Sequence, residues 1–160
     1  MVRPRHIRDI VPAHGGNQMQ DFRRLDVWGK AHELVVILYR ATTTVSERRY
    51  PGLTSQLRRA ASAVPANIAE GCGHGSQREF ARFLQIALAS AHELHYHLLL
   101  ARDLDLLQNV AFARLEARTE QVKKMLSALR ARVREPLASS PSGTAKRRRS
   151  PPPTAVSRQP

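Results

Sequence analysis

A chain of 160 residues, 42% hydrophobic but only 5% aromatic, is long enough for one domain with a mainly aliphatic core. Its single cysteine, Cys72, excludes an intrachain disulfide framework and fits a reducing cytoplasm, and no apolar run approaches the roughly 18 residues of a membrane span. The formal net charge of +13 predicts attraction to polyanions such as nucleic acid. We therefore expect a soluble, cytoplasmic, basic protein with no membrane partner.

The two ends of the chain differ in composition from its middle. Residues 1–20 lack a helical period, so we expect a disordered extension, within which Met19 is an alternative start of translation. Residues 136–160 are rich in Pro, Ser and Arg, which predicts a disordered tail. The tail contains the basic cluster Lys146, Arg147, Arg148 and Arg149, a site for salt-sensitive binding of nucleic acid. The folded domain is predicted to span residues 21–135.

Apolar residues that recur at steps of three and four predict two helices in the first half of the chain. The first spans about 27–44, and its apolar face consists of Trp28, Ala31, Val35, Leu38, Thr42 and Val45. The apolar face of the second consists of Leu53, Leu57, Ala61, Val64 and Ile68. Pro65 lacks a backbone N–H and should kink this second helix, and the glycines that begin at Gly71 should end it.

Two further helices are predicted in the second half. Ser76 and Glu79 have the spacing of a capping box, a start signal for the third helix. Its apolar face consists of Phe80, Leu84, Ala87, Ala91, Leu94, Leu98 and Ala101. After a turn at 105–109, the fourth helix carries Phe112, Leu115, Thr119, Val122, Leu126, Leu129 and Val133. Four amphipathic helices with short connections predict an all-α, antiparallel up-and-down four-helix bundle.

Several sequence blocks resemble one family. They are the segment LDVWGKAHEL at 25–34, GLTSQLRRA at 52–60, PANIAEG at 65–71 and EFARFL at 79–84. Together they resemble the four-helix bundle proteins encoded in intervening sequences of bacterial 23S ribosomal RNA. The resemblance implies a non-enzymatic protomer of a ring-shaped homo-oligomer, a homopentamer. It also implies a relation to the accessory variability proteins of diversity-generating retroelements, which bind a reverse transcriptase and nucleic acid.

Arg58 and Arg59 lie on the second predicted helix and point away from its apolar face at 100° per residue. Either side chain could donate two hydrogen bonds to a phosphate, or could pair with a carboxylate such as Glu70 or Glu93 across an interface. We favour phosphate binding for Arg58 and a structural role for Arg59. The doublets Arg23-Arg24 and Lys123-Lys124 are further candidates for nucleic-acid binding, although such pairs are usually solvated.

Other polar and aromatic residues are expected to have structural or interface roles. Asn67 and Glu70 follow the proline, where backbone groups freed by the kink need hydrogen-bond partners. Gln56 belongs to a family-like block, Glu93 follows the last of these blocks as part of the same resemblance, and Trp28 lies on a face that is needed for packing. We expect these side chains to join helices or protomers.

No site for chemistry is predicted. His92 and His95 lie within about 60° on a helix and could share an ion, and a ring could bring one histidine from each copy together. His97 cannot converge with them from a single helix, however, and we expect neither a metal nor another cofactor. The glycine-rich stretch 71–75 lacks the strand and lysine of a phosphate-binding loop, and Cys72 and His74 are poorly placed to form a nucleophile pair. We therefore expect that the protein is not an enzyme.

The sequence favours an oligomeric helical bundle that binds nucleic acid, RNA or DNA, or a nucleic-acid-handling partner such as a reverse transcriptase. Residues 19–136 carry 18 basic and 12 acidic residues, so the folded part remains basic without the tails. The alternative is a protein–protein interaction scaffold whose basic charge has no role in nucleic-acid binding.

Overall fold

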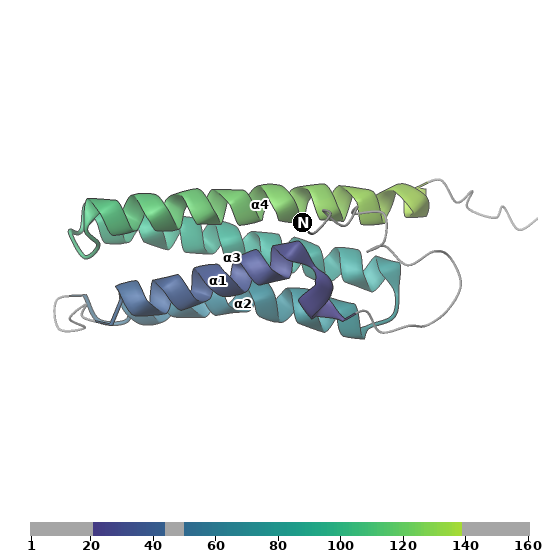
Figure 1. Ribbon diagram of the computed structural model, residues 1–160, viewed down its shortest axis with the longest axis horizontal. Helices are drawn as coiled ribbons and strands as arrows, with labels where there is room; N and C mark the ends of the chain where they lie inside the picture. Colours follow the sequence, from purple (N-terminus) through teal and green to yellow (C-terminus); the bar gives the residue numbers. More distant parts are fainter. Residues whose placement is uncertain (1–20, 44–49, 139–160) are drawn as a thin grey trace, which may run out of the picture.

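The computed structural model contains four long helices that lie side by side (Figure 1). It describes residues 21–43 and 50–138, and within them every regular element is helical. The helices are α1 (Asp26–Ala41), α2 (Leu53–Gly73), α3 (Gln77–Asp103) and α4 (Asn109–Ala138), and a short 3₁₀ helix, η2 (Phe22–Arg24), precedes α1. The all-α four-helix prediction is confirmed for this part of the chain.

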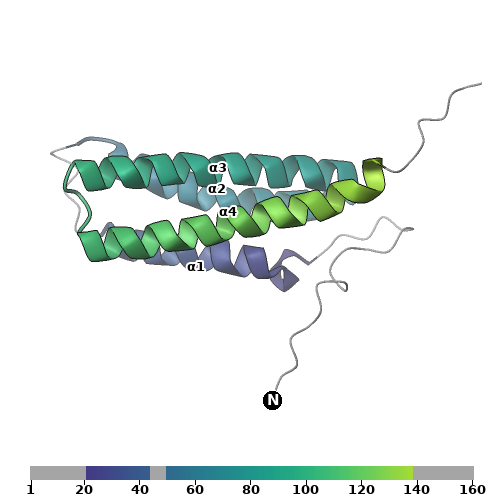
Figure 2. The same ribbon diagram turned by 90° about the horizontal axis from the view of Figure 1, so that it is seen from above.

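Consecutive helices run in opposite directions, and their connections alternate between the two ends of the bundle (Figures 1 and 2). Each helix packs against its neighbours in the chain, and α1 also packs against α4. None of the helices in 21–43 and 50–138 is long and apolar enough to cross a bilayer. The predictions for 1–20, 139–160, Val45 and the 146–149 cluster fall outside the described residues.

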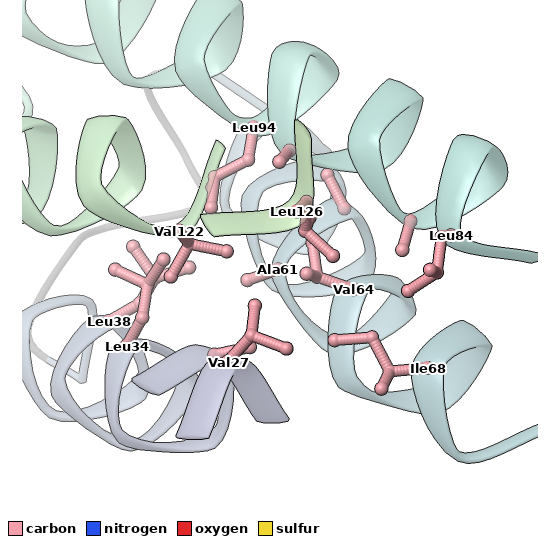
Figure 3. Packing of buried hydrophobic residues seen from close by; sticks show 14 of the residues in the cluster. Val27, Leu34, Leu38, Ala61, Val64, Ile68, Leu84, Leu94, Val122 and Leu126 are labelled. Carbon is pink, nitrogen blue, oxygen red and sulfur yellow. The ribbon is translucent and has the colours of Figure 1, made fainter. Parts of the chain in front are cut away.

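The predicted apolar faces of α2, α3 and α4 form the core. Figure 3 shows side chains from all four helices meeting in the interior of the bundle. The side chains that are less than 2% exposed include Leu84, Leu94 and Leu98 of α3 and Leu115, Val122 and Leu126 of α4. Burial of aliphatic area on this scale is the main source of stability for a bundle of this size.

The predicted face of α1 is partly confirmed, because Ala31, Leu38 and Thr42 are buried, but the other two described positions are wrong by one residue. The deeply buried residues of this helix are Val27, Ala31, Leu34 and Leu38. Trp28 and Val35 are only half-buried at the edge of the core. The Trp28 indole instead packs against Phe22 of η2, with ring centroids 4.8 Å apart, and stacks on His32 at 5.1 Å.

The predicted capping box at the start of α3 does not form. Ser76 is the N-cap residue and has an extended backbone, but its side chain accepts no capping hydrogen bond. The Glu79 carboxylate instead accepts a hydrogen bond from Arg82 Nε at 2.9 Å. A side-chain ion pair one turn along the helix thus replaces the expected bond back to the N-cap.

The glycine stretch ends α2, as predicted, but the helix continues past Gly71 to Gly73, and it is Gly75 in this stretch that has a left-handed φ of +60°. Gly71 is buried where α2 approaches α3. A Cβ added at Gly71 would lie 2.7 Å from the Phe83 Cβ atom and 3.1 Å from a Phe80 ring carbon. The missing side chain therefore permits a close contact between these two helices.

Pro65 lies inside α2, which is continuous from Leu53 to Gly73. Two residues later, the Asn67 amide Nδ2 donates a hydrogen bond of 2.7 Å to the Ala63 carbonyl. Asn67 therefore bonds to the backbone of its own helix near the proline, one of the roles expected for it. Glu70 is exposed and forms no ion pair with the described residues.

Substitution Gly71→Ala should lower the free energy of unfolding by about 1–3 kcal/mol, because the new methyl group overlaps Phe83 and forces α2 and α3 apart. Gly73→Ala is the matched control, since nothing lies within 4 Å of a Cβ built there. Its effect should stay within about 0.5 kcal/mol. Urea denaturation of the full chain gives both values, and equal losses for the two variants would contradict the packing role of Gly71.

Candidate nucleic-acid interface

The charge surplus of the bundle is concentrated on α4. Residues 109–134 contain seven basic and two acidic residues, whereas α1 and α3 each carry equal numbers of both signs. The stretch 121–134, called the basic segment below, has no acidic residue. Its cations are Lys123, Lys124, Arg130, Arg132 and Arg134. Glu120 and Glu135 flank the segment, but no carboxylate lies within it, so a surface of this kind attracts anions.

The rotation of α4 directs these cations to its surface. Val122, Leu126, Leu129 and Val133 of the basic segment are buried. Lys124, Arg132 and Arg134 are exposed, and Arg130 is half-buried. None of these four cations forms an ion pair with a side chain in the described ranges, so their charge is available to a ligand.

Arg23 and Arg24 lie in η2, at the same end of the bundle as the C-terminal end of α4 (Figures 1 and 2). Both are exposed. Arg23 Nη1 lies 3.9 Å from an Asp21 carboxylate oxygen, and its guanidinium sits over the Phe22 ring at 4.9 Å. These two arginines add positive charge at the end of the bundle where the basic segment ends. The other arginine pair predicted to bind nucleic acid, Arg58 and Arg59, lies on a different helix, α2.

Arg58 closes the C-terminal end of α1. Its Nε donates to Thr42 Oγ1 and its Nη2 donates to the Thr42 carbonyl, both at 3.0 Å. The guanidinium also lies over the Tyr39 ring at 5.0 Å. These contacts join α2 to the end of α1 and occupy two of the donor groups that a phosphate would need. Phosphate binding by Arg58 remains a prediction, but the structure gives this residue a clear packing role.

Arg59 joins α2 to α3. Its Nη2 lies 2.7 Å from Glu93 Oε1, and its Nε donates to Gln56 Oε1 at 3.0 Å. The sequence left Glu70 and Glu93 open as carboxylate partners, and the structure shows Glu93 of the same chain. His97 Nε2 lies 3.7 Å from the same Glu93 oxygen. Gln56, Arg59 and Glu93 thus form one polar group on the surface between two helices.

A second polar group between α3 and α4 was missed by the sequence analysis. His95 Nδ1 lies 3.1 Å from both Lys123 Nζ and Glu120 Oε1, and His95 Nε2 lies 3.5 Å from Glu116 Oε1. Glu116, Glu120 and Lys123 share one side of α4 because they are spaced by four and three residues. Nothing in the sequence shows that this side faces His95, since the packing of α4 on α3 decides it.

The other chemical candidates are used in packing. Burial raises the pKa of the Cys72 thiol to about 11, so the group is protonated at neutral pH. The His74 ring stacks on Phe83 with centroids 4.8 Å apart, and Phe80 and Phe83 are buried and closed to nucleobases. Among residues 21–43 and 50–138, no three His, Cys, Asp or Glu side chains are grouped to hold a metal ion.

Comparisons with known proteins agree with the fold. A family model described as "23S rRNA-intervening sequence protein" matches residues 23–128. Among solved structures, a protein of unknown function from the S23 ribosomal protein family of Bacteroides thetaiotaomicron has 24% sequence identity and a TM-score of 0.60. That match covers 66% of this chain and 95% of the other. No curated protein matches the chain.

The two adjacent arginines of α2 should differ in their contribution to stability. Arg58→Ala removes two hydrogen bonds to Thr42 and leaves a partly buried carbonyl without them, which should cost about 1–2 kcal/mol. Arg59→Ala removes an exposed ion pair and should cost less than about 1 kcal/mol. Urea denaturation of the two variants compares them directly, and the reverse order would contradict the capping role of Arg58.

Proposed function

The chain belongs to the 23S rRNA-intervening sequence protein family, and on this premise we propose that it is a non-enzymatic helical bundle that binds nucleic acid through the basic segment of α4. One observation supports the proposal above all others. Five cations lie on residues 121–134 without an acidic residue among them, and four of these cations have no partner in the described structure. The connection of the family with ribosomal RNA is consistent with a polyanionic ligand.

The basic segment suits recognition of a phosphate backbone. From Lys124 to Arg134 a helix rises by about 15 Å, a length over which duplex nucleic acid presents several phosphates. Arginine side chains can each donate two parallel hydrogen bonds to one phosphate. The large exposed apolar side chains of the described residues are Tyr39, Tyr96 and Val110, and none belongs to the basic segment. The segment therefore has no platform for base stacking, and binding should favour double-stranded over single-stranded nucleic acid.

We also propose that protomers assemble into a ring, as the family resemblance implies. Tyr39 of α1 is 44% exposed and Tyr96 of α3 is 61% exposed, and half-buried aliphatic residues accompany them on both helices. This apolar surface is available for contacts between copies. A ring would repeat the basic segment several times, and the resulting avidity would strengthen individually weak phosphate contacts.

A partner that itself carries nucleic acid, such as the reverse transcriptase of a retroelement, would suit the same surface. The competing proposal is a protein-interaction scaffold without a nucleic-acid role. Exposure of Tyr39, Tyr96 and Val110 favours it, because aromatic and aliphatic side chains are common at the centre of protein interfaces. The two proposals differ in whether the charge on α4 is needed.

Charge reversal on α4 should weaken binding of a 20-base-pair RNA duplex. In the full chain, Lys124→Glu combined with Arg132→Glu should lower affinity at least tenfold and reduce the slope of log K against log salt by about 2. The matched control reverses Arg40 and Arg78, two exposed arginines on α1 and α3, and makes the same charge change. Fluorescence anisotropy between 50 and 200 mM salt, as rough limits, measures both quantities.

The basic cluster at 146–149 could also bind the duplex, so its contribution is measured with a separate variant. Replacement of Lys146, Arg147, Arg148 and Arg149 by glutamine removes the charge of this cluster and changes no residue of the described helices. If this replacement abolishes duplex binding and the α4 variant binds like its control, the tail is a nonspecific anchor and the scaffold proposal replaces ours. Binding that survives in the tail variant but is lost on α4 reversal supports the basic segment.

Sedimentation of the full chain should show an assembly rather than a 17.9 kDa monomer. A homopentamer would have about five times that mass, because the apolar surfaces of α1 and α3 would be buried between copies. The measurement is made at micromolar concentration and at two salt concentrations, since an apolar interface should persist when salt is raised. A monomer under both conditions would contradict the ring.

A further inference from the structure

We infer that His95 acts as a pH-sensitive control of the basic segment, and that its protonation turns Lys123 from a partner of α3 into a cation available to nucleic acid. The inference rests on the proposed function, because its consequence is a change in phosphate binding. The control itself is a property of the α3–α4 contact and can be observed separately.

His95 lies between acidic and basic groups of α4. The side chain is 23% exposed, and its Nδ1 atom is 3.1 Å from both Lys123 Nζ and Glu120 Oε1. Its Nε2 atom is buried without a hydrogen-bond partner, and the nearest carboxylate oxygen, Glu116 Oε1, lies 3.5 Å away. Each ring nitrogen therefore has a carboxylate nearby, while the lysine competes for one of the two nitrogens.

The two protonation states of the ring use these neighbours differently. In the neutral ring, Nδ1 can accept a hydrogen bond from the Lys123 ammonium only if the proton is on Nε2. When the ring takes a proton from solvent, both nitrogens become donors, so Nδ1 donates to Glu120 and Nε2 approaches Glu116. Lys123 then loses Nδ1 as an acceptor and has to share its other acceptor, Glu120 Oε1 at 2.5 Å, with the new imidazolium N–H. The like charge beside it also weakens the hold of the ammonium on the α3–α4 contact.

The charges around His95 favour this exchange, in which the protonated ring replaces Lys123 as the hydrogen-bond donor to Glu120. Both carboxylates in ion-pair range of the ring, Glu116 and Glu120, attract a proton on it, one at each nitrogen. The hydrogen bond from Lys123 is the main cause that lowers the pKa of Glu120, and attraction to Lys123, His95 and Lys124 adds to it. Glu120 therefore stays ionised over the range of about pH 5 to 8 in which imidazoles titrate.

Apart from Glu116, Glu120 and Lys123, no charged side chain of the described residues is within ion-pair or hydrogen-bond distance of His95. On the α2 side of the helix, Glu93 pairs with Arg59 and lies near His97. His92 of α3 is exposed and makes no ion pair with the described residues. The acidic pair and lysine of α4 are thus the groups that respond when His95 changes charge.

The exchange would act on the proposed interface because Lys123 is the first cation of the basic segment and adjoins exposed Lys124. Release of Lys123 adds about one phosphate contact. An added contact makes the slope of log K against log salt steeper by about 0.9. Acidification should therefore increase both affinity and salt sensitivity.

The test compares duplex RNA binding by the full chain near pH 5.8 and near pH 7.8, two values inside the imidazole range of about 5 to 8. The wild-type slope should be steeper at the lower pH by about 0.9, and affinity at low salt should rise severalfold. His95→Gln should remove this difference, because glutamine does not titrate. His92→Gln is the matched control on the same helix and should keep it. An equal pH effect in the His95 variant and the wild type would overturn the inference.

NMR of the lysine ammonium groups separates this inference from the proposed function. In the wild type, the Lys123 signal should shift with the titration of the His95 ring, and in His95→Gln it should not. If the Lys123 signal does not change when His95 is protonated, the proposed pH dependence of Lys123 is overturned, whether or not the protein binds the duplex. If the Lys123 signal changes with the protonation of His95 but the protein binds no duplex at either pH, the pH dependence of Lys123 is supported and the nucleic-acid function is contradicted.

Discussion

Burial of the aliphatic seam of α4 against α1 and α3 determines which of its side chains reach solvent. Leu115, Val122, Leu126 and Val133 are at most 1% exposed. A helix buried at these four positions, which are spread over about five turns, cannot rotate without exposing them, and each would lose about 1.5–3 kcal/mol of favourable burial. The cations of residues 121–134 therefore occupy fixed positions on the surface, and the proposed interface depends on a core that contains no charged residue.

The charges elsewhere in the bundle are used differently. Glu33 of α1 pairs with Arg118 of α4, with nitrogen and oxygen 2.9 Å apart, and hydrogen bonding from Arg118 lowers the pKa of this carboxyl group. Arg59 and Glu93 similarly join α2 to α3. In each case a cation from one helix meets an acid from the next, so the positive field is partly cancelled there. After Glu120 no acid follows until Glu135, and the cations of α4 from Lys124 to Arg134 form no ion pair with the described residues.

The sequence predicted the fold well where one spacing rule decides the outcome. The apolar positions of α2, α3 and α4 were correct because steps of three and four residues define a single face. In α1, however, Val27 and Trp28 are adjacent, as are Leu34 and Val35, so two faces fit the same rule and contact with η2 decides between them. Gly71 illustrates another limit. A glycine is typical of a helix end, but this one permits contact with Phe83, a residue of a different helix.

Contacts across helices were the least predictable part of the candidate site. Glu93 was recognised as one of two partners open to Arg59, but the cluster around His95 was not found, because it depends on the axial position of α4 relative to α3. That position has a consequence for the interface. It places His95 where the ion-paired part of α4 ends and the acid-free part begins, so that Lys123 contacts α3 and also belongs to the basic segment. The two helices are antiparallel, so a histidine one turn earlier on α3 would lie next to the part of α4 that follows Lys123. Residues 121–134 of α4 contain no carboxylate that could accept a hydrogen bond from it. The same packing that exposes the basic segment therefore also gives its first cation a titratable neighbour.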